Sequence, residues 1–332
     1  MELSNIFSSN MVFAANKPIR IFGTGSGKAK IVFNGTTKNV ESSGADWLVE
    51  FPEMNYGGPY ELRAKFEDEE VVFNNIYIGE VYMISGQSNL QFKLKASSTK
   101  KELWQDNDKL RLYTVDRLEE GEFFKSEDGW VECKKETAGD WSAIGYLVGN
   151  EISRTKNIAV GIIACYQGAS IIESWLPEGT TQKLGIDIPN EEKYFDHYFE
   201  DYQLWNKEGK LYNHEFKKVA PFSVSGVIWY QGESDADGEE AKVYIDELKE
   251  LISVWRNDLK DTGLPFVVVQ LADCDERMND GWKLVQQAQF DIQNKLANVK
   301  TVISKDVCET DDIHPITKDK LASRIAQAIM LF

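Results

Sequence analysis

Positive charge is scarce in this sequence, which has 37 Lys and Arg residues against 54 Asp and Glu residues and a formal net charge of −17. A surface this acidic repels phosphate backbones and anionic lipids, so we expect neither nucleic acid nor a membrane as a partner. Apolar runs long enough to span a bilayer are missing, and the first residues carry no recognisable secretory signal. With Met1 taken as the native start, we expect a cytoplasmic protein.

Cysteine and histidine are also rare. The four cysteines lie far apart in the chain and form no Cys-x-x-Cys pair: Cys133, Cys165, Cys274 and Cys308. This spacing argues against a disulfide framework and against a zinc site, and it fits a reducing compartment. We therefore expect neither a metal nor another cofactor. Nothing in the sequence indicates an oligomeric state.

Short alternating strands separated by turn residues fill residues 1–76. Asn34-Gly35 is a strong hairpin signal after an apolar run, and Gly57-Gly58-Pro59 interrupts a later one. This texture predicts a small N-terminal antiparallel β-sandwich domain. The stretch Gly23–Lys28 resembles a phosphate-binding loop, but a strand pattern follows it where that loop requires a helix, so we interpret it as a turn.

Residues 77–332 have a different sequence pattern, in which apolar runs alternate with segments of helical periodicity. The apolar runs are those typical of buried parallel strands, at 81–85, 158–164, 224–230, 266–271 and 299–304. Helical patterns lie between them, with one apolar face in 241–255, for example. The alternation predicts an α/β domain with three layers and a mainly parallel sheet. Residues from about 177 to 220 are polar and irregular, and we interpret them as an insertion.

Ser88 follows the first of these strands, in the run Gly86-Gln87-Ser88-Asn89. Open α/β sheets place their chemistry at the carboxyl ends of strands, so a hydroxyl here is a candidate nucleophile. A serine that only caps a helix explains the position equally well. The choice depends on whether the chain supplies a base.

His314 is the best candidate for that base. The other two histidines, His197 and His214, lie in the polar insertion, whereas His314 follows the last predicted strand in Asp311-Asp312-Ile313-His314-Pro315. A carboxylate two or three residues before an imidazole can bind its Nδ1 atom and leave Nε2 for a serine. Asp311 and Asp312 are both candidates for this orienting role.

Two further strands end in unusual polar stretches. Gly168, after the run at 158–164, can present a backbone N–H to a developing oxyanion, and Gln231 can present a side-chain amide. Glu233 lies close to Gln231 in the same motif. Each position has an ordinary structural explanation, a turn for Gly168 and a structural carboxylate for Glu233. Together with the stretches that contain Ser88 and His314, four polar stretches follow four predicted strands, and this favours a catalytic site.

These motifs together resemble the sialate O-acetylesterase family of carbohydrate esterases, which belongs to the SGNH-hydrolase superfamily. The resemblance rests on Gly79 to Asn89, on Trp229-Tyr230-Gln231-Gly232-Glu233-Ser234 and on Asp312-Ile313-His314-Pro315. The N-terminal segments Ile6 to Val12 and Gly57-Gly58-Pro59-Tyr60 are similar to the β-sandwich that precedes the catalytic domain in bacterial members. The resemblance implies a flavodoxin-like α/β/α catalytic domain.

The resemblance also implies a role for each matching residue. Ser88 becomes the nucleophile and His314 the base, while the backbone N–H groups of Ser88 and Gly168, together with Gln231, hold the oxyanion. For three further motif residues the resemblance implies contact with the substrate or support of the catalytic residues: Gln87, Asn89 and Glu233. Asp311 fits the Asp-x-x-His spacing of the superfamily and Asp312 the Asp-Ile-His-Pro motif of the family; a Ser–His dyad without either is the remaining alternative.

The expected activity is removal of O-acetyl groups from an acetylated mono- or oligosaccharide, of the sialate or the acetylxylan type. Two departures from the family pattern affect the expected pocket: Gln167-Gly168-Ala169-Ser170 replaces Trp-Gly-Gly-Thr, and Leu90 replaces a methionine. Two alternatives stay open. They are a carbohydrate-binding protein with weak catalysis and a thioesterase or lipase-like member of the superfamily.

Overall fold

The computed structural model describes residues 1–332 apart from 45, 68, 120–121, 125–128 and 189–203. The centre of the fold is a sheet with the order β12-β9-β13-β8-β14-β15-β16. Neighbouring strands pair in parallel, except that β12 runs antiparallel to β9. The bounds are β8 Glu70–Gly86, β9 Asn107–Thr114, β12 Trp130–Cys133, β13 Val160–Tyr166, β14 Gly226–Tyr230, β15 Phe266–Val269 and β16 Val299–Val302.

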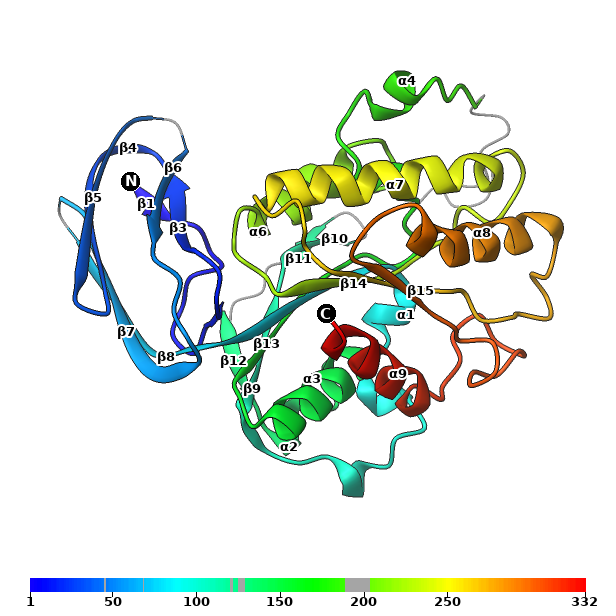
Figure 1. Ribbon diagram of the computed structural model, residues 1–332, viewed down its shortest axis with the longest axis horizontal. Coiled ribbons are helices and arrows are strands. Elements are labelled where there is room, and N and C mark those ends of the chain that lie inside the picture. Colours follow the sequence, from blue (N-terminus) through cyan, green and yellow to red (C-terminus); the bar gives the residue numbers. More distant parts are fainter. Residues whose placement is uncertain (45, 68, 120–121, 125–128, 189–203) are drawn as a thin grey trace.

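Helices cover both faces of this sheet. Helices α7 (Glu240–Asp258) and α8 (Asp280–Asp291) lie on one face, and α3 (Ala143–Lys156) and α9 (Asp319–Met330) lie on the other (Figure 1). Strands β13, β14 and β15 are buried along their whole length, as strands covered on both faces must be. The predicted mixed α/β fold with a central sheet is confirmed. The short helices are α1 Ser88–Gln91, α2 Lys135–Ala138, α4 Thr180–Leu184 and α6 Lys217–Val219.

The N-terminal residues form two further groups of strands. One is the sheet β1-β3-β6, and the other extends the central sheet through β5, β4 and β7 to the first half of β8, with β2 beside it. The rings of Phe33 in β4 and Phe51 in β6 meet edge to face with centroids 6.1 Å apart, so the two groups face each other. The bounds are β1 Glu2–Leu3, β2 Val12–Ala14, β3 Ile19–Thr24, β4 Ser26–Phe33, β5 Thr36–Ser43, β6 Trp47–Phe51 and β7 Gly57–Lys65.

One local prediction about this part is confirmed and another needs correction. Asn34 and Gly35 join β4 to β5 with φ angles of 45° and 75°, as a tight hairpin turn requires. The interpretation of 23–28 as a turn was too broad, because β3 ends at Thr24, β4 begins at Ser26 and only Gly25, with a φ of 92°, lies between them. A strand follows Gly25, and not the helix that a phosphate-binding loop requires. The parallel pairing of β2 with β8 departs from a purely antiparallel arrangement. The β-sandwich class of this part stays a prediction.

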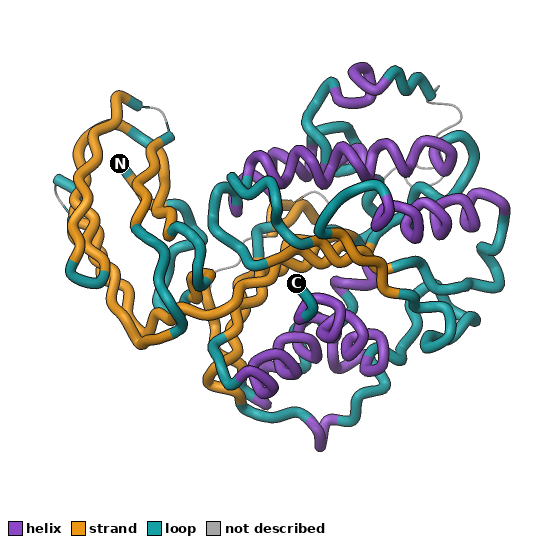
Figure 2. Tube along the Cα trace, in the orientation of Figure 1, coloured by secondary structure: helices purple, strands orange, loops and turns teal. Residues whose placement is uncertain are grey.

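Strand β8 belongs to both parts of the chain. Its first half pairs with β7 and β2, and its second half pairs with β13 and β14 in the centre of the α/β sheet. Figure 2 shows the strand running from one part to the other without a break. The predicted domain boundary at residues 76–77 therefore falls inside a continuous strand, where no linker exists.

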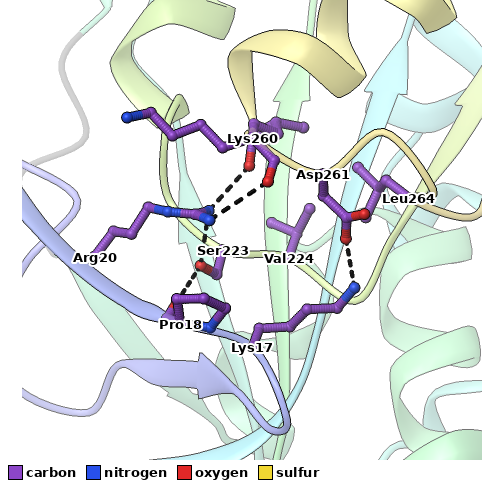
Figure 3. A pocket seen from close by; sticks show the side chains of 9 residues that line it. Lys17, Pro18, Arg20, Ser223, Val224, Lys260, Asp261 and Leu264 are labelled. Carbon is purple, nitrogen blue, oxygen red and sulfur yellow. Dashed lines mark hydrogen bonds and ion pairs between the residues drawn. The ribbon is translucent and has the colours of Figure 1, made fainter. Parts of the chain in front are cut away.

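Side-chain contacts also join the two parts. The ring of Phe222 stacks on Phe13 at a centroid distance of 5.5 Å, and Phe7 packs beside it. The buried guanidinium of Arg20 binds Glu50 of its own part and donates across the junction to the Ser223 hydroxyl and to the Leu259 carbonyl, at 3.2 and 3.0 Å (Figure 3). A pocket of about 240 Å³ lies at this junction. The polar groups of the junction are thus used to hold the parts together.

Several smaller expectations can be compared with the structure. Cys133, Cys165 and Cys274 are buried free thiols, and Cys308 is a half-buried one. Within the described ranges, no helix combines the length and the apolarity that a membrane crossing would need. The predicted insertion at 177–220 contains α4, α6 and the π-helical turn η6 (Tyr212–Phe216), while its residues 189–203, with His197, lie outside the described residues. A hairpin of β10 (Arg117–Glu119) and β11 (Glu122–Phe124) lies between β9 and β12.

Candidate active site

The turn after β8 places Ser88 at the carboxyl end of the central sheet. Gly86 has a φ of 138°, and a Cβ atom there would lie 2.1 Å from the carbonyl oxygen of Tyr230, so only glycine fits. The next backbone N–H, that of Gln87, donates to the same carbonyl at 3.0 Å. Ser88 then begins the single turn of α1 and is half-buried. The close approach of the parallel strands β8 and β14 at Gly86 and Tyr230 thus fixes where the hydroxyl lies.

The side chain of Gln87 fastens this turn to the motif after β14. Its carbonyl oxygen accepts from the Gly232 N–H at 3.2 Å, and its amide donates to the Ser234 hydroxyl at 3.3 Å. Gln87 is buried. Gln87 therefore lies behind Ser88 and supports the turn that carries it.

His314 meets Ser88 across the site. The Nε2 atom of His314 lies 2.8 Å from the Ser88 hydroxyl oxygen, which is hydrogen-bond distance. Burial lowers the pKa of His314 below its usual value, the nearby Lys318 ammonium lowers it further, and Asp312 opposes both effects. A neutral imidazole can accept a proton from a hydroxyl. The pair thus has the geometry that a nucleophile and its base require, and the lowered pKa of His314 favours the neutral imidazole.

Neither candidate aspartate binds the other nitrogen of His314. The Asp312 carboxylate lies 3.8 Å from Nδ1, beyond hydrogen-bond distance, and accepts instead from the backbone N–H of His314 at 2.7 Å. Asp311 is exposed and forms no ion pair with His314 in the part of the chain that the structure describes. The described contacts are those of a Ser–His pair, and an orienting role for Asp311 or Asp312 stays a prediction.

Gly168 lies beside Ser88, as an oxyanion donor must. A Cβ atom on Gly168 would be 3.8 Å from the Cβ atom of Ser88. The Gly168 N–H, however, donates to the side-chain oxygen of Gln91 at 2.9 Å. An oxyanion can use this donor only after the Gln91 side chain has moved. Sequence reasoning did not single out Gln91, because nothing distinguishes it from any polar residue of a helical turn.

The expected oxyanion role of Gln231 needs correction. Gln231 is fully buried, and its amide nitrogen donates to the Ser170 carbonyl at 2.8 Å and to the Asp235 carboxylate. Its side-chain oxygen accepts from the hydroxyl of Tyr244 at 3.1 Å. Both amide hydrogens are therefore in use, and Gln231 in this arrangement cannot donate to an oxyanion. It holds the loops after β13 and β14 together.

The loop after β13 is held in an unusual conformation. Ala169 has a φ of 52°, in the left-handed region that disfavours a Cβ atom. Asn206 clamps this loop, since its amide donates to the Ala169 carbonyl at 2.7 Å and its oxygen accepts from the Ile171 N–H at 3.0 Å. Asn206 comes from the polar insertion, where no sequence motif indicates such a contact.

A buried polar cluster lies behind the pair, formed by Asn89, Glu233 and Lys318. The Asn89 amide donates to Glu233 at 2.6 Å and to the Ile313 carbonyl at 3.0 Å, and its oxygen accepts from the Lys318 ammonium at 2.6 Å. Burial raises the pKa of Glu233 and lowers that of Lys318 to about 8. The predicted neighbours Asn89 and Glu233 are thus brought together near the pair. Lys318 was missed, because in sequence it resembles a surface lysine at a helix start.

We found no cluster of three or more His, Cys, Asp or Glu side chains suited to a metal ion among the described residues.

Curated proteins with similar sequences include two mammalian sialate O-acetylesterases. The enzyme of Homo sapiens is 25% identical over 321 aligned residues, which cover 86% of this chain and 60% of the relative. That of Mus musculus is 24% identical and is covered to 63%. This chain therefore spans less than two thirds of the length of those relatives. A probable carbohydrate esterase of Arabidopsis thaliana is 25% identical, over 80% of this chain and 95% of its own length.

Comparison with solved structures and with protein families agrees with these relatives. The crystal structure of a carbohydrate acetylesterase from Xanthomonas citri has a TM-score of 0.84 and 25% identity, over 98% of this chain and 74% of that chain. The sequence model of one family, described as "Carbohydrate esterase, sialic acid-specific acetylesterase", matches residues 78–330. Since this match covers well over half of the chain, the chain belongs to that family of carbohydrate esterases.

Proposed function

We propose that this chain is a serine esterase that removes O-acetyl groups from a carbohydrate. The observation that carries the proposal is the 2.8 Å contact between His314 Nε2 and the Ser88 hydroxyl, at the carboxyl edge of a parallel sheet. Membership in a carbohydrate esterase family supports the reaction class. The SGNH-type catalytic domain of the sequence resemblance is part of the same proposal.

The reaction proceeds through an acyl-enzyme. Ser88 Oγ attacks the acetyl carbonyl carbon while His314 Nε2 takes the hydroxyl proton. When the tetrahedral intermediate collapses, the C–O bond to the sugar breaks and His314 returns the proton to the sugar oxygen. Water then attacks the acetyl-Ser88 ester with His314 again as base, and acetate leaves with Ser88 restored.

Two backbone N–H groups are proposed to hold the oxyanion, those of Ser88 and Gly168. As the first residue of α1, Ser88 has no acceptor for its N–H within the helix. The Gly168 N–H becomes available when the Gln91 side-chain oxygen leaves it. The substrate carbonyl oxygen would take the place that Gln91 occupies in the free enzyme.

The substrate class is an acetylated mono- or oligosaccharide. Sialate O-acetylesterases and a carbohydrate acetylesterase among the similar proteins support acetylated sugars as a class. Acetylated sialic acid and acetylated xylooligosaccharides are the two candidates that an assay must separate.

An acetate-release assay tests the proposal. Purified protein is given acetylated sialic acids, acetylated xylooligosaccharides and p-nitrophenyl acetate, with p-nitrophenyl octanoate as the long-chain comparison. We expect release from acetyl esters and a loss of about 10³-fold or more in kcat for Ser88→Ala. Undiminished turnover by Ser88→Ala, or a preference for octanoate, would contradict the proposal. Sugar binding without acetate release would identify a binding protein instead.

A further inference from the structure

The His314 ring lacks the support that a triad carboxylate provides. Its Nδ1 atom is 3.8 Å from Asp312, which is exposed and already bound to backbone. An imidazole that acts as a base must nevertheless be held in one orientation toward its serine. Other contacts must therefore hold the loop between β16 and α9, which carries His314 and is called the base loop below, against the turn Gly86–Asn89, which carries Ser88.

Asn89 makes the contact that joins these two segments. It is the residue directly after Ser88, and its amide donates to the carbonyl of Ile313, the residue directly before His314, at 3.0 Å. The same amide nitrogen donates to Glu233 at 2.6 Å, which ties the pair to the loop after β14. Asn89 is 2% exposed. One side chain thus links the backbone of the nucleophile to the backbone of the base.

Lys318 determines which way the Asn89 amide points. An ammonium group only donates, so the Asn89 oxygen must face the Lys318 nitrogen, 2.6 Å away. The nitrogen of the amide then faces Glu233 and the Ile313 carbonyl, which both accept. A flipped amide would set donor against donor and acceptor against acceptor. The lysine therefore selects the only orientation in which Asn89 holds the base loop.

Lys318 also reaches His314 through Phe92. The ammonium lies 5.0 Å from the centre of the Phe92 ring, and that ring stacks on the His314 imidazole at 6.4 Å and 25°. Lys318 is 0% exposed, and burying an ammonium costs several kcal/mol. A position with only a packing role is filled at lower cost by an apolar side chain. The contacts of Lys318 with Asn89 and with the Phe92 ring, both next to Ser88 and His314, explain why a buried lysine is present at this position.

We propose that Lys318 is a positioning residue for the Ser88–His314 pair, acting through the Asn89 amide and the Phe92 ring. It stands in the place of the carboxylate that orients the base in a triad. The inference rests on the proposed esterase function and adds a residue to it. Lys318 itself touches neither the substrate nor the reacting atoms.

Lys318→Met tests this assignment, because methionine keeps the apolar stem and removes the charge and the donors. Lys320→Met, an exposed position two residues further along α9, is the matched control. We expect kcat for p-nitrophenyl acetate to fall about 10- to 100-fold in Lys318→Met, with KM changed little and the control unaffected. Inactivation of Ser88 by an organophosphate should slow to a similar extent.

The pH profile separates positioning from a general loss of structure. The charged groups near the imidazole are Asp312 in its own loop and Lys318 at the start of α9. Without the ammonium, the acid limb of kcat/KM should move to higher pH, an effect that a smaller folded fraction cannot produce. A folded Lys318→Met with wild-type kcat and wild-type pH profile would overturn the inference.

A second variant covers the case in which Lys318→Met does not fold. Asn89→Ser is too short to bridge Lys318 and the Ile313 carbonyl, so we expect a comparable fall in kcat; wild-type kcat in this variant would also overturn the inference. Failure of the esterase proposal looks different. In that case the wild-type protein releases no acetate, or Ser88→Ala keeps the activity.

Discussion

The imidazole Nε2 of His314 and the hydroxyl of Ser88 lie 2.8 Å apart although 226 positions separate them in the chain. Ser88 follows β8, in the middle of the sheet, whereas His314 follows β16 at its edge. The loop between β16 and α9 must therefore cross the ends of β15 and β14 to reach the serine. The contacts of Asn89 and Asp312 fasten this loop where it arrives.

The two candidate aspartates should be dispensable for most of the rate. We expect Asp311→Asn and Asp312→Asn each to lower kcat less than about 10-fold, because neither carboxylate binds Nδ1, whereas the same change in a serine protease triad costs about 10⁴-fold. An asparagine at 312 can still accept the backbone N–H of His314. Steady-state kinetics on p-nitrophenyl acetate measures this. A loss above about 100-fold in either variant would restore the triad.

The pH dependence of the reaction should follow His314. Its pKa is lowered, so the neutral form that accepts the Ser88 proton persists below pH 6.5 and is lost only as the pH falls through the lowered value. We expect kcat/KM to be level near neutral pH and to decline on the acid side below 6.5. Asp312→Asn removes a charge that raises this pKa, so its acid limb should lie at lower pH than in the wild type. A limb that moves upward in this variant would contradict the assignment.

Gln91 should control access to the Gly168 donor. In Gln91→Leu the N–H of Gly168 has no competing side-chain acceptor, so we expect kcat/KM equal to or above that of the wild type. Gln91→Glu places a negative charge where the oxyanion forms and should lower kcat/KM about 10- to 100-fold. Comparing the two variants on one acetyl ester gives the answer. Equal effects would show that the oxyanion does not form at Gly168.

Gln231 should affect stability more than rate. Gln231→Leu removes the donor to the buried Ser170 carbonyl and to one oxygen of the Asp235 carboxylate, so we expect a loss of about 2–3 kcal/mol in the free energy of unfolding. The kcat of the folded fraction should stay within about 10-fold, whereas loss of an oxyanion donor costs about 10²–10³-fold. Thermal unfolding and kinetics on the same preparation distinguish the two. A large fall in kcat at unchanged Tm would return Gln231 to the oxyanion hole.

The sequence was sufficient to predict the central architecture because apolar runs and turn residues report local structure. The runs at 224–230, 266–271 and 299–304 correspond to β14, β15 and β16, and the apolar face of 241–255 corresponds to α7. Only the hairpin signal of Asn34-Gly35 indicated strand β5, since Thr36–Ser43 itself is polar and mostly exposed. Its backbone pairing with β4 forms this strand although its own residues have no apolar pattern.

Only those site residues that lie in a motif with recognisable chemistry could be predicted from the sequence. Ser88 and His314 stand in distinctive surroundings, so the sequence could nominate them. The direction in which Gln231 points could not be read, because it depends on Ser170 and Asp235 after folding. Lys318 is equally invisible, since in the folded chain it is buried against Asn89 and Phe92, which lie far away in the sequence.

Strand β8 passes through both parts of the chain before it delivers Ser88 to the site. Side chains alternate between the two faces of a strand, so one residue added or removed near position 77 would reverse the facing of every later residue up to Gly86, or force a bulge. The N-terminal part is therefore joined to the nucleophile by register as well as by a peptide bond. Loops of either part can change in length without this consequence. Exchange of the whole N-terminal part, in contrast, requires a junction at which each residue of β8 keeps its side chain on the same face of the sheet.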